Sequence, residues 1–210
     1  MINKKEKSKI SLFFTSIFIL FLRYFPRLLT KLANKIRGEN GRKKLKENLD
    51  NLERKMLEGI NYTEHYVEIK NKQGHSRYIR TISMNTSETT KTPVVLVHGF
   101  MTGIPDWRHN IVNIYDKRAT YAFDLLGFGK SSREEFSLNF DQVEEEYINS
   151  IEEWRREMKL NKMILISHSF GSYLSAIYAF KYPDRVAGLI FEDPWGFGGV
   201  SFEKLFKLFY

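Results

Sequence analysis

The pentapeptide Ser167-His168-Ser169-Phe170-Gly171 has the spacing of a serine nucleophile on a sharp turn between a strand and a helix. The apolar run 163–166 precedes it, and an apolar segment typical of a helix follows. Small residues are needed two before and two after the nucleophile, because the strand and the helix approach closely there. Ser167 stands where the general pattern has glycine, which weakens the match without abolishing it. We predict Ser169 as the nucleophile, with Ser167, His168 and Gly171 supporting the turn.

A second loop could supply the electrophilic half of such a site. The sequence His98-Gly99-Phe100-Met101 follows the apolar run 93–97. Backbone N–H groups of Phe170 and of Phe100 or Met101 would stabilise the oxyanion that forms when a serine attacks a carbonyl. The beginning of the helix after Ser169 would favour the same negative charge. We expect Gly99 to shape this loop and His98 to brace it through hydrogen bonds to the backbone.

The base that should take the serine proton is not evident. The chain has five histidines, and none follows His168. His168 points from the turn itself, and His98 is expected to brace a loop. Asp193 belongs to the turn "DPWGF", and we expect a structural role for it. We expect the 210 residues to lack the catalytic histidine, and therefore to be inactive by themselves.

Composition excludes several other kinds of site. There is no cysteine, which excludes disulfides, thiolate-bound metals and a cysteine nucleophile. The histidines are scattered and form no pair with metal-ligand spacing, so we expect neither a metal nor a cofactor.

Charge is unevenly distributed along the chain. Residues 1–58 hold 15 Lys and Arg against 6 Asp and Glu, a net of +9, whereas residues 59–210 hold 18 against 19. Such a basic arm suits anionic lipid or nucleic acid. Because no basic motif with interleaved aromatics and no zinc-finger spacing accompanies it, we expect a lipid surface and no nucleic acid.

Within the arm, residues 10–22 carry no charge. As a helix they rise about 20 Å, less than the roughly 30 Å hydrocarbon core of a bilayer. Three interpretations of 10–25 stay open: a helix lying in the membrane interface, an uncleaved signal-anchor, or a helix buried against the domain. No small-residue cleavage site follows, which argues against secretion. Further along, Leu45, Leu49, Leu52 and Met56 form a helical stripe that is expected to pack.

The rest of the chain alternates strands and helices. Two alternating segments, 65–70 and 77–84, predict an antiparallel hairpin. Continuous apolar runs predict buried strands, and apolar residues at steps of 3 and 4 predict a helix over 139–160. The pattern predicts an α/β fold with a mostly parallel sheet and helices on both faces. The further strands are expected at 93–99, 120–124, 163–167 and 185–193.

Four segments together carry a resemblance to a known family: "PVVLVHGF", "YAFDLLGFGKSS", "SIEEWRREMKLNKMILISHSFGSYLSAIYAFKYPDRV" and "LIFEDPWGF". They resemble the α/β-hydrolase superfamily and, within it, the subfamily of the N-acyl-phospholipid lysophospholipase and the lipid-droplet coactivator of triglyceride lipase. The resemblance runs from about residue 60 to residue 198. It implies the α/β-hydrolase fold, with Ser169 in the position that is serine in the catalytic branch. Some members of the superfamily which this sequence resembles have their acid where Asp193 stands, which is the alternative to a structural role for it.

The resemblance also implies a function. Members of the subfamily act on acyl groups of glycerophospholipids, and lysophosphatidic-acid acyltransferase activity has been ascribed to them. It implies a phospholipid, lysophospholipid or other acyl-lipid substrate, and a membrane or lipid-droplet surface with a lipase or droplet-coat protein as a further partner. The expected location is the cytoplasmic face of the endoplasmic reticulum or the lipid droplet, with the mitochondrion as an alternative.

The superfamily has eight strands, and this chain stops after what reads as the sixth. We therefore expect an arm at 1–58, a partial hydrolase core at 59–198, and a tail at 199–210 leading to a missing cap region. The run "VAGLIF" would be left as an apolar edge strand. Three functions stay open: a membrane-associated lipid esterase, a non-catalytic lipid-surface adaptor that regulates a lipase, and a generic soluble esterase.

Overall fold

The computed structural model describes residues 41, 43–71, 73–133, 136–137 and 139–196. The chain divides into two compact units, one of Met1–Lys55 with Glu135–Glu145 and one of Met56–Glu134 with Glu146–Tyr210. The predicted helix at 10–25 and the predicted tail at 199–210 lie outside the described residues. No helix in the described part of the chain is long and apolar enough to cross a membrane.

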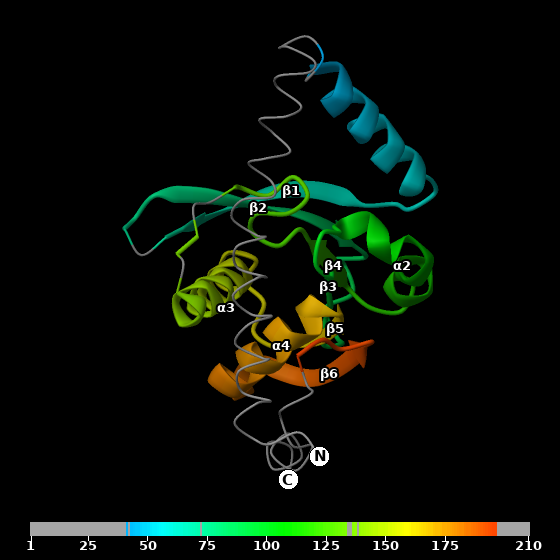
Figure 1. The fold of residues 1–210 in the computed structure, drawn as a ribbon. Helices are drawn as coiled ribbons and strands as arrows, with labels where there is room; N and C mark the ends of the chain where they lie inside the picture. The colour runs from blue at the N-terminus through cyan, green and yellow to red at the C-terminus, as the bar shows by residue number, and fades with distance from the viewer. Residues whose placement is uncertain (1–40, 42, 72, 134–135, 138, 197–210) are drawn as a thin grey trace, which may run out of the picture. The chain divides into compact units, whose positions relative to one another are not determined.

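The second unit is built on a six-stranded sheet in the order β1-β2-β4-β3-β5-β6 (Figure 1). The first two strands form the predicted antiparallel hairpin, and β2 also runs antiparallel to β4. The pairs β3–β4, β3–β5 and β5–β6 are parallel, which confirms the α/β prediction. The strands are β1 (Thr63–Lys70), β2 (Ser76–Met84), β3 (Val94–Val97), β4 (Thr120–Phe123), β5 (Met163–His168) and β6 (Val186–Glu192).

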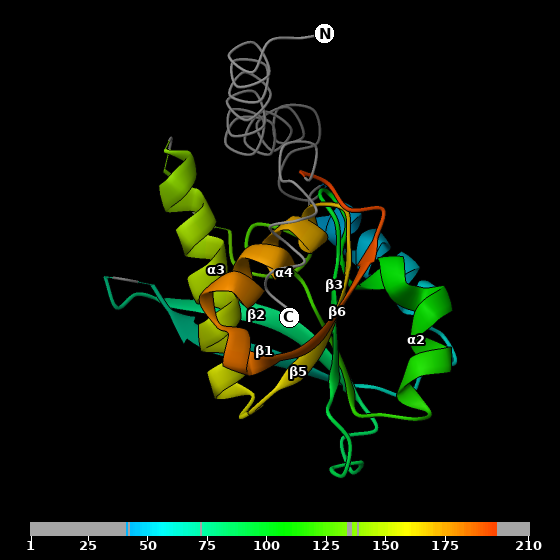
Figure 2. The ribbon, with the colours of Figure 1, turned by 90° about the horizontal axis from the view of Figure 1, so that it is seen from below.

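Helices cover both faces of this sheet. In Figure 2, α2 lies on one face, and α3 and α4 lie on the other. Strands β3 and β4 are buried along their whole length, and for β3 the unbroken apolar sequence predicts this. The helices are α2 (Arg108–Tyr115), α3 (Phe140–Glu157) and α4 (Phe170–Lys181), with short 3-10 turns η1 (Ile104–Trp107) and η2 (Pro183–Arg185). Both η1 and α2 lie in a stretch for which the sequence predicted no element.

Each face of the sheet has its own packing. On the α3 side, Trp154 is buried against the rings of Phe123 and Tyr121, and its Nε1 donates to Thr81 Oγ1 at 2.8 Å. Tyr147, Ile151 and Trp154, which the helical period predicted as one face, are all buried. The other core cluster contains Leu57, Ile82, Met84, Val94, Leu96, Ile104, Trp107, Ile111 and Ala122.

The other unit contains most of a helix over residues 43–56, followed by a turn that ends at Gly59 with φ of +82°. The predicted apolar stripe is present on this helix, and among the described residues it is largely exposed. Leu49 and Leu52 are each 56% exposed. Spacing at 4, 3 and 4 selects one face of a helix, but it does not decide whether another element covers that face.

Strand β6 is an edge of the sheet in the described part of the chain, as predicted. Ile190 on this strand is 53% exposed. The strand nevertheless matters to the site, because its carboxyl end lies beside the end of β5, where Ser169 follows.

Candidate active site

Ser169 joins β5 to α4 in a strained backbone conformation. Its φ of 49° and ψ of −116° belong to a region that side-chain-bearing residues rarely occupy, at a cost of about 1–3 kcal/mol. Backbone hydrogen bonds hold it there. The Ser169 N–H donates to Glu192 O at 3.1 Å, and its carbonyl accepts from the N–H groups of Ser172 at 3.0 Å and Trp195 at 3.2 Å. The turn therefore presents the Ser169 side chain at the carboxyl end of the sheet, where it is partly exposed.

The absence of a side chain at Gly171 allows α4 to start against the end of β3. A Cβ at Gly171 would lie 2.5 Å from the carbonyl oxygens of both Val97 and His98. Ser167, on the other side of the turn, is buried, and its carbonyl accepts from Ser172 Oγ at 2.6 Å. The Ser167 Oγ has no hydrogen-bond partner within the described residues. A serine thus fits at the position where the pattern has glycine, although its buried hydroxyl lacks a hydrogen bond within the described residues.

The loop after β3 lies directly against this turn. A Cβ at Gly99 would be 3.2 Å from the Ser169 Cβ. The ring of Phe100 packs edge-on against Phe170 at 6.4 Å and Phe128 at 5.5 Å. Met101, in the same loop, is exposed and has a positive φ of +61°. Both segments with predicted oxyanion donors thus border Ser169, and the role of their N–H groups stays a prediction.

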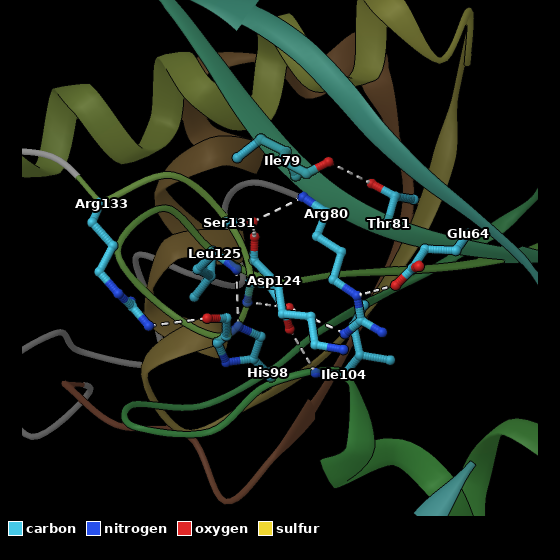
Figure 3. A network of polar contacts seen from close by, with 12 residues as sticks. Glu64, Ile79, Arg80, Thr81, His98, Ile104, Asp124, Leu125, Ser131 and Arg133 are labelled. Carbon is cyan, nitrogen blue, oxygen red and sulfur yellow. Dashed lines mark hydrogen bonds and ion pairs between the residues drawn. The ribbon is translucent and has the colours of Figure 1, made fainter. Parts of the chain in front are cut away.

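His98 is fully buried and bonded to backbone on both ring nitrogens. Its Nε2 accepts the Leu125 N–H at 2.9 Å (Figure 3). Its Nδ1 lies 2.7 Å from Gly99 O. Both contacts are satisfied when Nδ1 carries the proton. Burial lowers the pKa of His98, which keeps the ring neutral. The ring therefore links the loop after β3 to the loop after β4, and neither nitrogen faces Ser169 as a base would.

Asp124 is a buried acid that the sequence analysis did not single out. It is fully buried at the end of β4, and Figure 3 shows it at the centre of the network. Its Oδ1 accepts the Ile104 N–H at 2.8 Å, and its Oδ2 accepts the Lys130 N–H at 2.9 Å. The carboxylate fits because Gly129 has no side chain: a Cβ there would lie 2.2 Å from it. The signal was in "AFDLLGFG", an acid that ends an apolar strand before two glycines.

Arg80 balances this buried charge. Its Nη1 lies 3.3 Å from Asp124 Oδ2, and its Nε donates to Glu64 Oε1 at 2.7 Å. Ser131 adds two bonds, because its hydroxyl accepts the Arg80 N–H at 2.9 Å and donates to Asp124 O at 2.6 Å. The loops after β3 and β4 are thus tied to β2 by a buried, bonded set of polar groups.

His168 lies on the other side of the loop after β3. Its Nδ1 is 3.6 Å from Asp106 Oδ2, too far for a hydrogen bond, and this buried nitrogen has no hydrogen-bond partner in the described part of the chain. Both side chains are about one-third exposed. A pocket of about 110 Å³ lies beside them. Sequence reasoning missed Asp106 because its partner is 62 positions away in the chain. The pocket is lined by Asp106, Trp107, Asn110, His168 and Glu192.

Asp193 lies just after β6 with φ of +44° and is exposed. Its carboxylate makes no hydrogen bond to a histidine among the residues that the structure describes. The turn that it begins continues to Trp195, whose ring packs against Tyr173 at 5.7 Å and Phe170 at 6.1 Å. Asp193 therefore begins a turn that packs beside Ser169, and its role as an acid stays a prediction.

Residues 92–210 match a family model described as the alpha/beta hydrolase fold. Two kinds of curated relative are similar over 71% of this chain. One is the human 1-acylglycerol-3-phosphate O-acyltransferase ABHD5, which is 43% identical over 149 residues, or 42% of its own length. The other is the human (Lyso)-N-acylphosphatidylethanolamine lipase, which is 40% identical over 151 residues, or 43% of its length. The chain thus spans less than half the length of these relatives.

Solved structures agree on the fold. The naproxen esterase of Bacillus subtilis superposes with a TM-score of 0.58 at 21% identity, covering 68% of this chain and 46% of that one. A membrane phospholipase A described as a bacterial virulence factor gives 0.56 at 20% identity, covering 82% and 51%. At these identities the likeness supports the fold alone.

Proposed function

The chain belongs to the alpha/beta hydrolase fold family, and from that membership we propose that the whole protein is a serine hydrolase of lipid esters with Ser169 as its nucleophile. The observation that carries this proposal is the strained Ser169 backbone, with φ of 49°, between β5 and α4. Strain of this kind persists only where the surrounding structure enforces it, and it gathers at reactive sites. Gly171 and Gly99, which leave no room for side chains, support the same interpretation.

In the proposed reaction, Ser169 Oγ attacks the acyl carbonyl and its proton passes to a base. The carbonyl electron pair moves to the oxygen, which the N–H groups of Phe170 and of Phe100 or Met101 stabilise. The carbonyl then re-forms, the alcohol leaves with the proton, and water releases the acyl group. His98 is committed to backbone, so the base in this proposal comes from the part of the whole protein outside these 210 residues.

Aromatic side chains beside Ser169 favour an acyl-chain substrate. Phe170 stacks with Tyr173 at 6.5 Å and contacts Phe100 and Trp195 edge-on. Met101, next to Phe100, is 59% exposed. Phe170 itself is buried, whereas Met101 and Trp195 are exposed beside it, and exposed apolar side chains adjacent to a nucleophile suit an acyl chain better than a polar group. With the relatives' names, this surface supports lysophospholipids or N-acyl phospholipids as substrates, and lysophosphatidic acid as an acyl acceptor in place of water.

A second candidate is a non-catalytic adaptor on a membrane or lipid droplet that binds a lipase or a droplet-coat protein. The net charge of +9 over residues 1–58 favours it. We place either activity at the cytoplasmic face of the endoplasmic reticulum or at the lipid droplet, with the mitochondrion as the alternative.

Replacing Ser169 by alanine in the full-length protein tests the enzyme proposal. We expect hydrolysis of lysophosphatidylethanolamine to fall by roughly 10⁶-fold, and labelling by a fluorophosphonate to disappear. Ser175→Ala is the matched control. Its buried hydroxyl on α4 has no hydrogen-bond partner in the described part of the chain, so the variant should keep both. Full activity in Ser169→Ala would contradict the proposal, and a wild-type protein that resists labelling would favour the adaptor.

A further inference from the structure

The ring of His168 occupies the space that a side chain at position 99 would need. A Cβ built on Gly99 would lie 2.8 Å from His168 Nδ1 and 3.3 Å from its Cε1. His168 is the last residue of β5, the strand that directly precedes Ser169. Its ring therefore packs the end of this strand against the start of the loop after β3. The peptide that follows Gly99 carries the predicted Phe100 donor.

The same ring also faces the end of that loop. His168 Nδ1 is 3.6 Å from Asp106 Oδ2, and Asp106 belongs to η1. The Asp106 N–H donates to Gly103 O at 3.0 Å, so its carboxylate is tied to the loop through one tight turn. One side chain from β5 therefore meets both ends of the segment 99–106.

The remaining charged groups near the ring come from other elements. Glu192, at the end of β6, lines the same pocket and adds a second carboxylate. His98 and Asp124 lie on the opposite side of the loop, within the buried network. Asp106 and Glu192 thus place two carboxylates in the same pocket as the His168 ring.

From these contacts we propose that His168, which lies against Gly99 and beside Asp106, is a positioning residue that holds the loop 99–106 to the Ser169 turn. The proposal rests on the function proposed above, because it concerns the placement of the predicted oxyanion donors. The loop then has two fastenings. The buried one joins it to β4 through His98 and Asp124, and the partly exposed one joins it to β5 through His168 and Asp106.

This fastening has a physical reason. Oxyanion donors act only when they are held close to their productive geometry, and a misplacement of about 1 Å can cost about 10²-fold in rate. Gly99 brings no side chain of its own with which to hold its peptide. Contact with a ring from the strand that carries the nucleophile sets the donor and the nucleophile relative to each other directly.

Kinetics of the full-length protein test the pairing. We expect His168→Leu and Asp106→Asn each to lower kcat by about tenfold or more with little change in KM, because only the transition state uses the oxyanion donors. The double variant should fall no further than the worse single variant. His168→Asn should recover much of the loss, because its amide can donate to Asp106. Asn110→Ala, which changes the same pocket without touching Gly99, is the control and should behave as wild type.

Amide hydrogen exchange distinguishes a role of His168 in placing the loop 99–106 from a role in the stability of the whole domain. Amides of residues 99–106 should exchange faster in His168→Leu and Asp106→Asn, while strands β3 and β5 keep their protection. Variants that lower the melting temperature but keep kcat per fluorophosphonate-labelled site would overturn the proposal. Additive losses in the double variant, or unchanged exchange in the loop, would also overturn it. A wild-type protein that is not labelled at Ser169 would contradict the proposed function alone, and the exchange rates would still decide the fastening.

Discussion

The surroundings of Asp124 and those of Ser169 differ in how completely their polar groups are bonded. Asp124 is fully buried, and both of its carboxylate oxygens accept backbone N–H groups. Ser169 is partly exposed in a strained conformation, Ser167 keeps an unpartnered hydroxyl, and His168 lies 3.6 Å from Asp106. The two regions lie on either side of the loop after β3.

This difference indicates that the two regions have different roles: the network around Asp124 supports the loop after β3, and the turn at Ser169 is suited to chemistry. Buried polar groups are costly unless they are bonded, so a complete network makes a rigid support. A reactive site needs an exposed nucleophile in an enforced geometry, and it tolerates strain and incomplete bonding. The buried region should therefore govern stability, whereas the Ser169 region should govern chemistry.

The largest stability effect is expected at Asp124. Asp124→Ala leaves Arg80 buried without this partner and frees two backbone N–H groups, so the free energy of unfolding should fall by about 3–5 kcal/mol. Urea denaturation measures this fall. Asp116→Ala, on the exposed end of α2, is the matched control and should change it by less than about 0.5 kcal/mol. Equal losses in the two variants would contradict the proposal that the buried network around Asp124 governs stability.

Two buried serines, Ser131 and Ser167, are expected to contribute differently to the free energy of unfolding. The Ser131 hydroxyl makes two bonds in the buried network, so Ser131→Ala should lower the free energy of unfolding by about 1–2 kcal/mol. The Ser167 hydroxyl has no partner in the described part of the chain, so Ser167→Ala should be neutral or slightly stabilising. Thermal and urea denaturation of both variants measure the difference, and a clear loss of stability in Ser167→Ala would contradict it.

Lowering the pH should reduce the free energy of unfolding through the buried side chain of His98. Burial lowers the pKa of His98 below its ordinary 6.5, so on acidification the unfolded chain binds this proton first. The stability due to neutral His98 is complete above pH 6.5 and is lost as the pH falls toward the folded-state pKa, with a slope of at most about 1.4 kcal/mol per pH unit. Urea denaturation between pH 7.5 and 5 should show this slope in wild type and a flatter one in His98→Asn. The same pH dependence of stability in wild type and His98→Asn would contradict a role for His98 in the loss of stability.

The smallest effect is expected from relieving strain at Ser169. Glycine adopts positive φ freely, so Ser169→Gly should raise the free energy of unfolding by about 1 kcal/mol while activity is lost. Ser169→Ala keeps a Cβ and should show the loss of activity without that gain. Chemical denaturation of the two variants side by side tests the point, and equal stabilities would mean that the backbone there holds no strain.

Local sequence was sufficient for part of this fold. Alternation over 65–70 and 77–84 predicted the β1–β2 hairpin, and unbroken apolar runs predicted β3 and β5. Helix α2 was missed because its sequence, RHNIVNIY, buries only Ile111 and so has little periodicity. Its position depends on packing against the sheet rather than on its own pattern.

The sequence by itself determined the strand-to-helix turn at Ser169, because size limits at Ser167 and Gly171 act between near neighbours in the chain. It also located the basic charge at 1–58. Only the tertiary structure decided which polar groups meet. Asp124 reaches Ile104 and Arg80 across 20 and 44 positions, and His168 reaches Asp106 across a longer separation. Such pairs depend on strand order, since β4 and β5 flank β3 in the sheet although both follow it in the chain.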